Sequence, residues 1–221
     1  MTDQRPTPPI PQRLRRAPQQ ARSRARIGEA LDAAERLLVS EGADAVTTTR
    51  VAAEAGAAVG SVYRYFPDKS AIFDALATRY LGEFEALMEE MVTRAGDETW
   101  EDPIGLLIDV YVDHYRIHPA LRALWFGRHL SDEIAAVDRR HKRTMADGVR
   151  RILIRLGLVT GTPSLATISH AAVLTADALI QESFRTDAEG DPALLAEAKR
   201  ILRAYLADLQ AAEPATEKGR R

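Results

Sequence analysis

Apolar residues recur at intervals of three and four along most of the chain, and this spacing constrains the fold more than any other feature of the sequence. It places apolar side chains on one face of an α-helix, whereas a half-buried strand would alternate apolar and polar residues. We find no such alternation and no internal repeat. Glycines, prolines and capping residues divide the pattern into about nine segments, so the sequence predicts an all-α protein.

The beginning of the chain is basic. Its first 26 residues carry seven arginines and a single acid, Asp3, together with prolines and glutamines. Residues 1–21 show no hydrophobic period, and we expect them to form a disordered basic arm. Such an arm can neutralise DNA phosphates, although its charge is equally compatible with a solvated tail. Residues 212–221 are predicted to form a disordered tail.

The composition is that of an ordinary globular protein, with 46% hydrophobic and 28% charged residues. No apolar run approaches the length of about 20 residues that spans a bilayer, and no apolar stretch follows the arginines to make a secretory signal. The absence of cysteine excludes disulfides, thiolate zinc sites and cysteine nucleophiles. We therefore expect a cytoplasmic protein without a membrane partner.

Residues 22–66 are predicted to form three helices. The first carries an apolar stripe that ends before Gly42, and Thr47 is placed to cap the second, which Gly56 can terminate. The third is expected over residues 58–65. Two short helices that flank a glycine-containing turn and pack on a third helix describe a helix-turn-helix.

A long fourth helix is predicted to follow. Pro67 disfavours helix at Phe66, so we expect the new helix to begin at Pro67 or Asp68 and to continue through Met91. Ser131 is placed as a cap, and Thr162-Pro163 and Asp191-Pro192 each pair a capping residue with a proline at the first helical position. The later helices are expected over residues 103–118, 120–130, 132–156, 163–185 and 192–211.

The stretch from Thr47 to Lys69 closely resembles the DNA-binding signature of the TetR family of bacterial regulators. It contains a small-residue helix ending in Ala55-Gly56, the sequence Tyr63-Arg64-Tyr65-Phe66, and a lysine three residues after Phe66. The resemblance covers about residues 22–76 and is far more specific than a lone glycine motif. It implies a DNA-binding domain over residues 22–66 and a larger helical domain for ligand binding and dimerisation over residues 67–211.

The resemblance also implies that residues 58–65 enter the major groove of DNA. It assigns phosphate contacts to Thr47, Thr49, Tyr63, Tyr65 and Lys69, and places Val59, Gly60, Ser61 and Arg64 at or beside the bases. Only Ser61 and Arg64 in the second group can donate hydrogen bonds to base edges. We therefore expect the arginine arm to supplement specificity in a minor groove, while a solvated role for Arg64 stays open.

The second domain is expected to hold a largely apolar small molecule between the fourth helix and the helices that follow it. Candidate lining residues, each of which could equally belong to the core, are Phe84, Met88, Tyr111, His114, Tyr115, Trp125, Phe126, His129 and Asp177. His114 and His118 have a spacing that could serve a metal, but no third ligand is evident and Pro119 follows directly. No metal and no cofactor are predicted.

Homodimerisation is expected through the helices near residues 163–185 and 192–211. Small residues such as Ala171, Ala172 and Ala176 permit the close approach that a four-helix interface needs, although an intrachain bundle would show the same stripes. A dimer also suits a helix-turn-helix, which gains specificity from two half-sites one helical turn apart.

Together these features predict a repressor that binds palindromic operator DNA as a homodimer and is released by a small molecule. One alternative is an architectural protein that coats DNA without a ligand. A second, an all-α enzyme, lacks support because we find no glycine-rich phosphate loop and no convincing acid-base pair, and we predict no catalytic residues.

Overall fold

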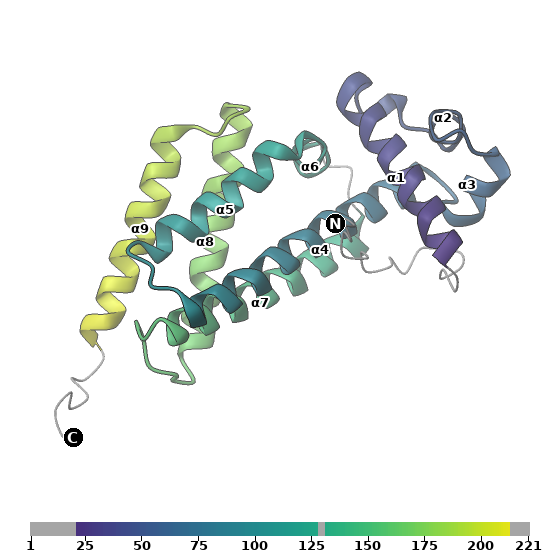
Figure 1. The fold of residues 1–221 in the computed structure, drawn as a ribbon. Coiled ribbons are helices and arrows are strands. Elements are labelled where there is room, and N and C mark those ends of the chain that lie inside the picture. The colour runs from purple at the N-terminus through teal and green to yellow at the C-terminus, as the bar shows by residue number, and fades with distance from the viewer. Residues whose placement is uncertain (1–20, 128–130, 213–221) are drawn as a thin grey trace. The chain divides into compact units, whose positions relative to one another are not determined.

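The computed structural model describes residues 21–127 and 131–212, and this part of the chain contains nine α-helices, one short 3-10 helix and no strand (Figure 1). The all-α prediction is therefore confirmed. The helices are α1 (Ala21–Glu41), α2 (Thr48–Glu54), α3 (Val59–Tyr65), α4 (Lys69–Asp97), α5 (Pro103–Ile117), α6 (Pro119–Phe126), α7 (Asp132–Arg155), α8 (Leu165–Thr186) and α9 (Pro192–Ala212), and the 3-10 helix η1 is Ala43–Ala45. Apart from Ala21 and Ala212, the predicted arm and tail lie outside the described residues.

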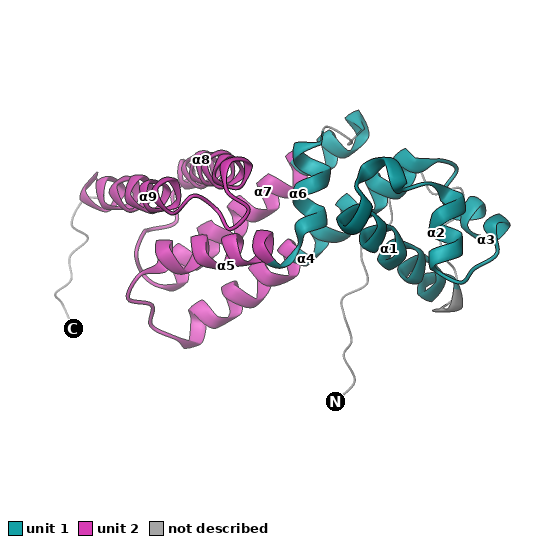
Figure 2. Ribbon diagram, turned by 90° about the horizontal axis from the view of Figure 1, so that it is seen from above, with its two compact units in different colours: residues 1–83, 117–138 teal, residues 84–116, 139–221 magenta. Residues whose placement is uncertain are grey.

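The helices form two compact units, which Figure 2 shows in different colours. Unit 1 combines the chain up to Glu83 with Ile117–Asp138, and unit 2 combines Phe84–Arg116 with the chain from Arg139 onward. The helix-turn-helix thus shares its unit with the first half of α4, with α6 and with the start of α7. The domain boundary after Phe66 that the sequence suggested remains a prediction.

Most helix ends lie where the sequence placed them. Thr47 caps α2, with its hydroxyl accepting a hydrogen bond from the amide of Arg50 at 3.2 Å. Ser131 caps α7 in the same way, through a 3.3 Å bond from the amide of Ile134. The α4 helix begins slightly later than expected, at Lys69, because the carboxylate of Asp68 accepts from the amide of Ala71 at 2.8 Å and thereby acts as the cap.

The start of α8 differs from the prediction. The helix begins at Leu165, and Ser164 rather than Thr162 holds the capping position, without a side-chain capping bond. The hydroxyls of Thr162 and Ser164 lie 3.0 Å apart and bond to each other instead. Pro163 therefore belongs to the preceding turn, since a threonine hydroxyl that is engaged locally does not hold a helix start at the next residue.

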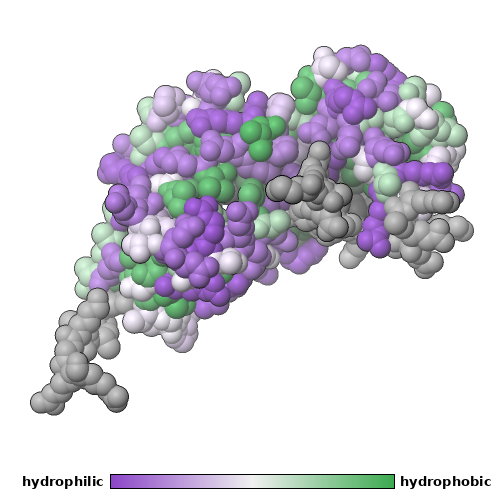
Figure 3. Space-filling model, viewed as in Figure 1, coloured by the Kyte–Doolittle hydropathy of each residue, from purple (hydrophilic) through white to green (hydrophobic). Residues whose placement is uncertain are grey.

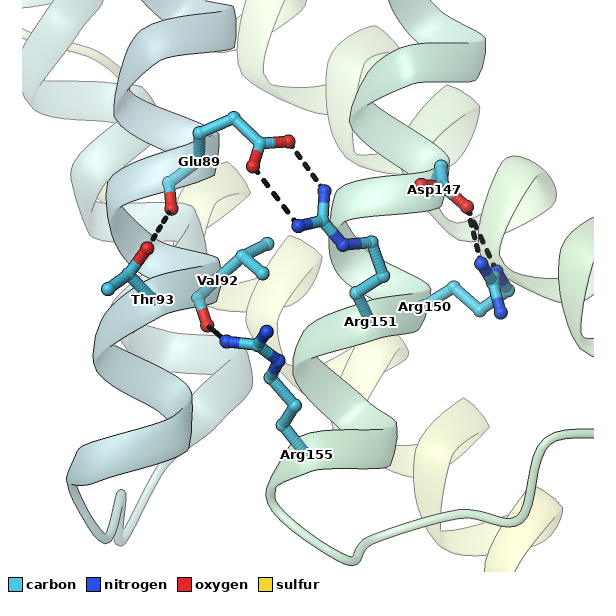
Figure 4. A network of polar contacts seen from close by, with 7 residues as sticks. All are labelled: Glu89, Val92, Thr93, Asp147, Arg150, Arg151 and Arg155. Carbon is cyan, nitrogen blue, oxygen red and sulfur yellow. Dashed lines mark hydrogen bonds and ion pairs between the residues drawn. The ribbon is translucent and has the colours of Figure 1, made fainter.

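Side-chain contacts between α4 and α7 bind the two helices together in unit 2, as Figure 4 shows. The guanidinium of Arg151 donates to both carboxylate oxygens of Glu89, at 2.6 and 3.1 Å, and Arg155 donates to the backbone carbonyl of Val92 at 2.8 Å. A Cβ atom at Gly148 would collide with the side chain of Met88. The missing side chain at Gly148 therefore permits close contact between α7 and α4 at this point.

The α9 helix packs against α8 and is also tied to α5. Arg203 forms two hydrogen bonds to the carboxylate of Asp102, at 3.0 and 2.5 Å, and Lys199 bonds to Asp109 at 2.5 Å. The buried residues of α9 are Leu195, Ala198 and Leu202. Among the described helices, none is both long and apolar enough to cross a membrane.

The capping difference between α8 and α9 can be tested by two matched substitutions. Asp191 accepts from the amides of Ala193 and Leu194, at 2.8 and 3.3 Å, whereas Thr162 accepts from no helix amide among the described residues. We expect Asp191→Ala to lower the free energy of unfolding by about 1 kcal/mol, the usual cost of a lost cap, and Thr162→Ala to have a clearly smaller effect. Urea denaturation followed by circular dichroism measures both. Equal losses would contradict the structural assignment.

Candidate DNA-binding surface and ligand cavity

The turn between α2 and α3 gives the helix-turn-helix its geometry. Gly56 adopts a φ of 61°, which L side chains rarely take, and the amide of Ala57 donates to the carbonyl of Ala52 at 2.8 Å. Ala52 is fully buried, so its small side chain permits the tight corner. Val62 is buried on the inner side of α3, and Phe66, directly after the helix, is also buried, whereas the opposite face of α3 is exposed.

Eight of the nine predicted DNA-contact residues are at least partly accessible. Thr47, Thr49, Val59, Gly60, Tyr63 and Arg64 are exposed, and Ser61 and Lys69 are half-buried. Val59 and Tyr63 are unusual for large apolar or aromatic residues, with 40% and 44% of their surface exposed. They give the outer face of α3 a largely apolar character at its centre.

Tyr65 is placed differently from the others. Its ring is only 5% exposed, its hydroxyl donates to Ser23 at 3.1 Å, and it accepts a hydrogen bond from Arg64 at 3.0 Å. The Arg64 guanidinium also lies 5.0 Å from the centre of the Tyr65 ring. Tyr65 therefore joins α3 to α1 and orients Arg64, and its phosphate contact remains a prediction.

Two ion pairs fasten α2 to α1. Arg50 donates to both carboxylate oxygens of Glu41, at 2.9 and 2.6 Å, and the Arg36 Nε atom donates to Glu54 at 2.9 Å. The hydrogen bonds from Arg50 hold the pKa of Glu41 below its ordinary value, and the reverse effect raises the pKa of Arg50. Because all four side chains are exposed, these pairs help orientation more than stability.

A more buried cluster joins α1 to α4 within unit 1. The Arg79 guanidinium, whose side chain is 13% exposed, donates to Asp32 at 2.6 Å and to Glu35 through its other terminal nitrogen. His118, at the start of α6, lies 4.0 Å from Glu35 and 3.4 Å from Glu83. Burial raises the pKa of Glu35, whereas the hydrogen bond to His118 and the charge of Arg79 lower it. The lowering effects together are larger, so the pKa lies below its ordinary value.

Unit 2 contains a predominantly apolar cavity. Its free volume is about 90 Å³, several times what a single water molecule needs. Its walls come from α4, α5, α7, α8 and α9. The lining residues are Met88, Ile104, Leu107, Ile108, Tyr111, Met145, Val149, Leu153, Ile168, Ser169, Ala172, Val173, Ala176, Asp177, Ile180, Leu202, Tyr205, Leu206 and Leu209.

Three of the predicted ligand contacts line this cavity: Met88, Tyr111 and Asp177. Three others, Phe84, His114 and Tyr115, lie in an adjoining aromatic cluster in which the Phe84 and Tyr111 rings stack with centroids 4.3 Å apart. Trp125 and Phe126 do not line this cavity, because they belong to α6 in unit 1. His129 lies outside the described residues.

The residues that sequence reasoning missed come mainly from α7, α8 and α9. Ala172 and Ala176 were expected to permit close helix approach at a dimer interface, and they line the cavity. Periodicity identifies the apolar face of a helix but does not identify what covers it. Leu174 on α8 and Ile201 on α9, which do not line the cavity, are exposed at 45% and 40%, and Tyr205 of the cavity wall is 38% exposed. In the view of Figure 3, hydrophobic residues likewise reach the surface of the molecule between hydrophilic ones.

A helix-turn-helix with an exposed third helix, followed by a helical unit with an apolar cavity, defines the class of helix-turn-helix regulators. Residues 30–76 match the family model for bacterial regulatory proteins of the tetR family, and residues 98–209 match that of the tetracyclin repressor-like C-terminal domain. The chain belongs to the TetR family of bacterial transcriptional regulators, which confirms the resemblance seen in the sequence. No curated protein is similar enough in sequence to count as a match.

Solved structures agree with this assignment. A TetR-family transcriptional regulator from Streptomyces coelicolor is 31% identical, with a TM-score of 0.60 over 85% of this chain and 98% of that chain. A TetR-family regulator from Mesorhizobium loti shares the fold at 17% identity, with a TM-score of 0.63 over 86% and 98% of the two chains. The SmeT–triclosan complex shares it at 20% identity, with a TM-score of 0.53 over 89% and 99%.

The Arg79 cluster leads to a prediction about acid stability. Arg79→Met should lower the free energy of unfolding by about 2 kcal/mol at neutral pH, because it leaves two carboxylates without their cation. The pKa of Glu35 is lowered in the folded state from its usual 4.5, so the stability it contributes is present above that pH and is lost as the pH falls through the folded-state pKa. The difference between wild type and variant should therefore shrink below about pH 4.5.

Urea denaturation at a series of pH values measures this difference. Arg200→Met is the matched control, because Arg200 forms an exposed ion pair with Glu197 on α9 and should contribute little. A difference between wild type and Arg79→Met that stays constant down to strongly acidic pH would show that Glu35 is not the titrating partner.

Proposed function

We propose that this chain is a repressor that binds a palindromic operator as a homodimer and leaves it when a largely apolar small molecule occupies the unit 2 cavity. The observation that carries this proposal is the exposed outer face of α3, on which Val59 and Tyr63 are unusually accessible. A helix that follows a tight turn and presents such a face has the geometry of a recognition helix.

The proposed DNA contacts fall into two groups. Tyr63, Thr49 and Thr47 carry hydroxyls beside helix starts or on the exposed face, and Lys69 supplies a cation, all of which suit phosphates. Lys69 lies 3.4 Å from Asp44, a fully exposed carboxylate that can exchange it for a phosphate at little cost. Ser61 offers a hydroxyl to a base edge, while Val59 and Gly60 present apolar surface that suits thymine methyl groups.

Arg64 is the other proposed base reader. Its hydrogen bond to Tyr65 and its position over the Tyr65 ring leave its remaining donors oriented by the protein. A pre-positioned guanidinium loses less side-chain entropy on binding a guanine edge. The arginines of residues 1–21, which lie outside the described residues, are proposed to add contacts in a minor groove.

The homodimer is proposed to form through α8 and α9. Leu174 and Ile201 expose 45% and 40% of their surface, one on each helix, and Ala171 beside Leu174 is exposed and small. Exposed apolar side chains on two helices that pack against each other offer a surface for a second copy. Two copies would supply the two recognition helices that a palindrome requires.

Ligand release is proposed to work by population shift. The second half of α4 contributes Met88 to the cavity wall, and the first half belongs to the unit that carries the helix-turn-helix. A ligand that prefers a different packing of α4 would disfavour the DNA-binding arrangement, and a shift from 99:1 to 1:99 requires a preference of about 5.5 kcal/mol. A protein of similar fold, SmeT, has been solved in complex with triclosan, which supports a small-molecule ligand for this cavity.

The first alternative, a ligand-independent architectural protein, is disfavoured by the cavity, because such a protein needs no ligand cavity. Membership of a family of transcriptional regulators speaks against an enzyme. The architectural alternative nevertheless makes a distinct prediction, namely weak sequence preference.

Selection from a random-sequence DNA library at two salt concentrations, with the full-length protein, tests the DNA-binding proposal. We expect enrichment of a palindrome.

Tyr63→Phe should weaken binding about tenfold on all enriched sequences, since it removes a phosphate contact, while Ser61→Ala should change the preferred base at one position of each half-site. Thr93→Val, which removes an exposed hydroxyl near the end of α4 and outside the helix-turn-helix, is the control and should bind as wild type. Binding without an enriched motif would favour the architectural alternative.

The dimer proposal is tested by placing a charge on the exposed α8 surface. Leu174→Glu should weaken the dimer at least about a hundredfold, because each copy would bury an unpaired carboxylate in the interface. Sedimentation equilibrium measures the association directly. Ile117→Glu is the matched control, since Ile117 is 68% exposed at the end of α5 and should leave the dimer intact. A dimer unaffected by Leu174→Glu would place the interface elsewhere.

A further inference from the structure

The apolar wall of the unit 2 cavity is interrupted on α8 by two polar side chains, Ser169 and Asp177. They are eight residues apart, which in an α-helix corresponds to about two turns and a separation of about 12 Å along the axis. Between them, Ala172, Val173 and Ala176 line the same cavity. One helix therefore presents two polar groups at the ends of an apolar strip.

Ser169 is buried without a partner. Only 1% of its surface is exposed, and its hydroxyl has no hydrogen-bond partner among the described residues. The other serine of the same helix has a partner, because the Ser183 hydroxyl donates to the carbonyl of Ile180 at 2.7 Å. Because a buried hydroxyl without a partner is costly, a ligand group that bonds to Ser169 would gain the full value of that bond.

The carboxylate of Asp177 already has two polar partners. It is 8% exposed; one carboxylate oxygen accepts from Lys142 at 2.9 Å and the other from Gln181 at 2.9 Å. Each oxygen keeps a lone pair for a further donor. A ligand cation would have to compete with Lys142, and a ligand anion would meet the carboxylate, so a neutral donor fits best.

We infer that the ligand of this cavity is a neutral, elongated molecule with an apolar body and a hydrogen-bonding group at each end, one bonded to Ser169 and the other a hydroxyl or N–H that donates to Asp177. The inference rests on the proposed function, which places the regulatory ligand in this cavity. It adds the ligand's charge, its length and the position of its polar groups.

A series of straight-chain probes that share ten carbons separates this inference from simple hydrophobic binding. The series consists of decanediol with a hydroxyl at each end, decanol, decanoate and decylammonium, each titrated calorimetrically into the full-length protein below its aggregation concentration. A purely apolar cavity would rank decanol above decanediol, because the second hydroxyl must lose its water. We expect decanediol to bind at least about fivefold more tightly than decanol and about tenfold more tightly than either charged probe.

Two substitutions assign the ends. Ser169→Ala should abolish the advantage of decanediol over decanol, whereas Ser164→Ala, which alters an exposed serine outside the cavity, should preserve it. Asp177→Asn should remove the carboxylate that repels an anion from the cavity wall and raise the affinity for decanoate about tenfold. Because the two variants alter different partners, a folding defect in one leaves the other as a test.

The inference would be overturned if decanol bound as tightly as decanediol, or if either charged probe bound best. It would also be overturned if neither alcohol bound, or if the ranking of the probes stayed the same in Ser169→Ala. Release of the selected operator is measured separately by fluorescence anisotropy. Serine-dependent binding of decanediol without operator release would support the cavity chemistry and count against ligand-released repression. Operator release by a probe whose affinity does not depend on Ser169 would support ligand-released repression and count against the cavity chemistry.

Discussion

The arrangement of unit 1 depends most on the ion pairs of Arg79, whose guanidinium is largely removed from water. A cation that is largely removed from water must have its charge compensated, and both compensating carboxylates, Asp32 and Glu35, come from α1. The two ion pairs therefore restrict how α1 can rotate and slide along α4. Since α2 is fastened to α1 and α3 packs on both, the placement of the recognition helix follows from how α1 is held. The surface ion pairs of α2 refine this arrangement but could not establish it alone.

The α4 helix must satisfy two packing environments with one stripe of apolar residues. Phe73, Leu76 and Tyr80 are buried in unit 1, and the same spacing continues through Phe84 and Met91 in unit 2. The glycine opposite Met88 shows how closely the second environment is fitted, because even one added carbon at Gly148 would collide. A helix fitted this closely cannot shift slightly without repacking, which is the property that a two-state response requires.

The sequence predicted the features that depend on neighbouring residues along the chain, such as helix ends. It did not predict contacts between residues that are far apart in the sequence. Thr47, Ser131 and the Asp191-Pro192 pair act locally, and their helix ends were found. The Arg79 pairs join residues more than forty positions apart, and nothing in the local pattern identifies them. Tyr65 illustrates the same limit: the resemblance assigned it a phosphate contact, but only the fold shows that its hydroxyl lies against Ser23. Cavity-lining and core residues share one periodicity, so the two could not be separated before the structure.

The α8 helix has apolar residues on two faces. A helical unit that is surrounded by water would need only one apolar face, the one that it buries. Ala172 and Ala176 line the cavity on one side, whereas Leu174 lies between them in sequence and is 45% exposed. A helix that buries one stripe normally presents polar residues on the opposite side. An apolar residue at the exposed position is therefore best explained by a further surface that covers it. If that surface is a second copy, the cavity and the dimer interface share a single turn of α8. A ligand that displaces Ala172 or Ala176 would then act on the interface within the same turn.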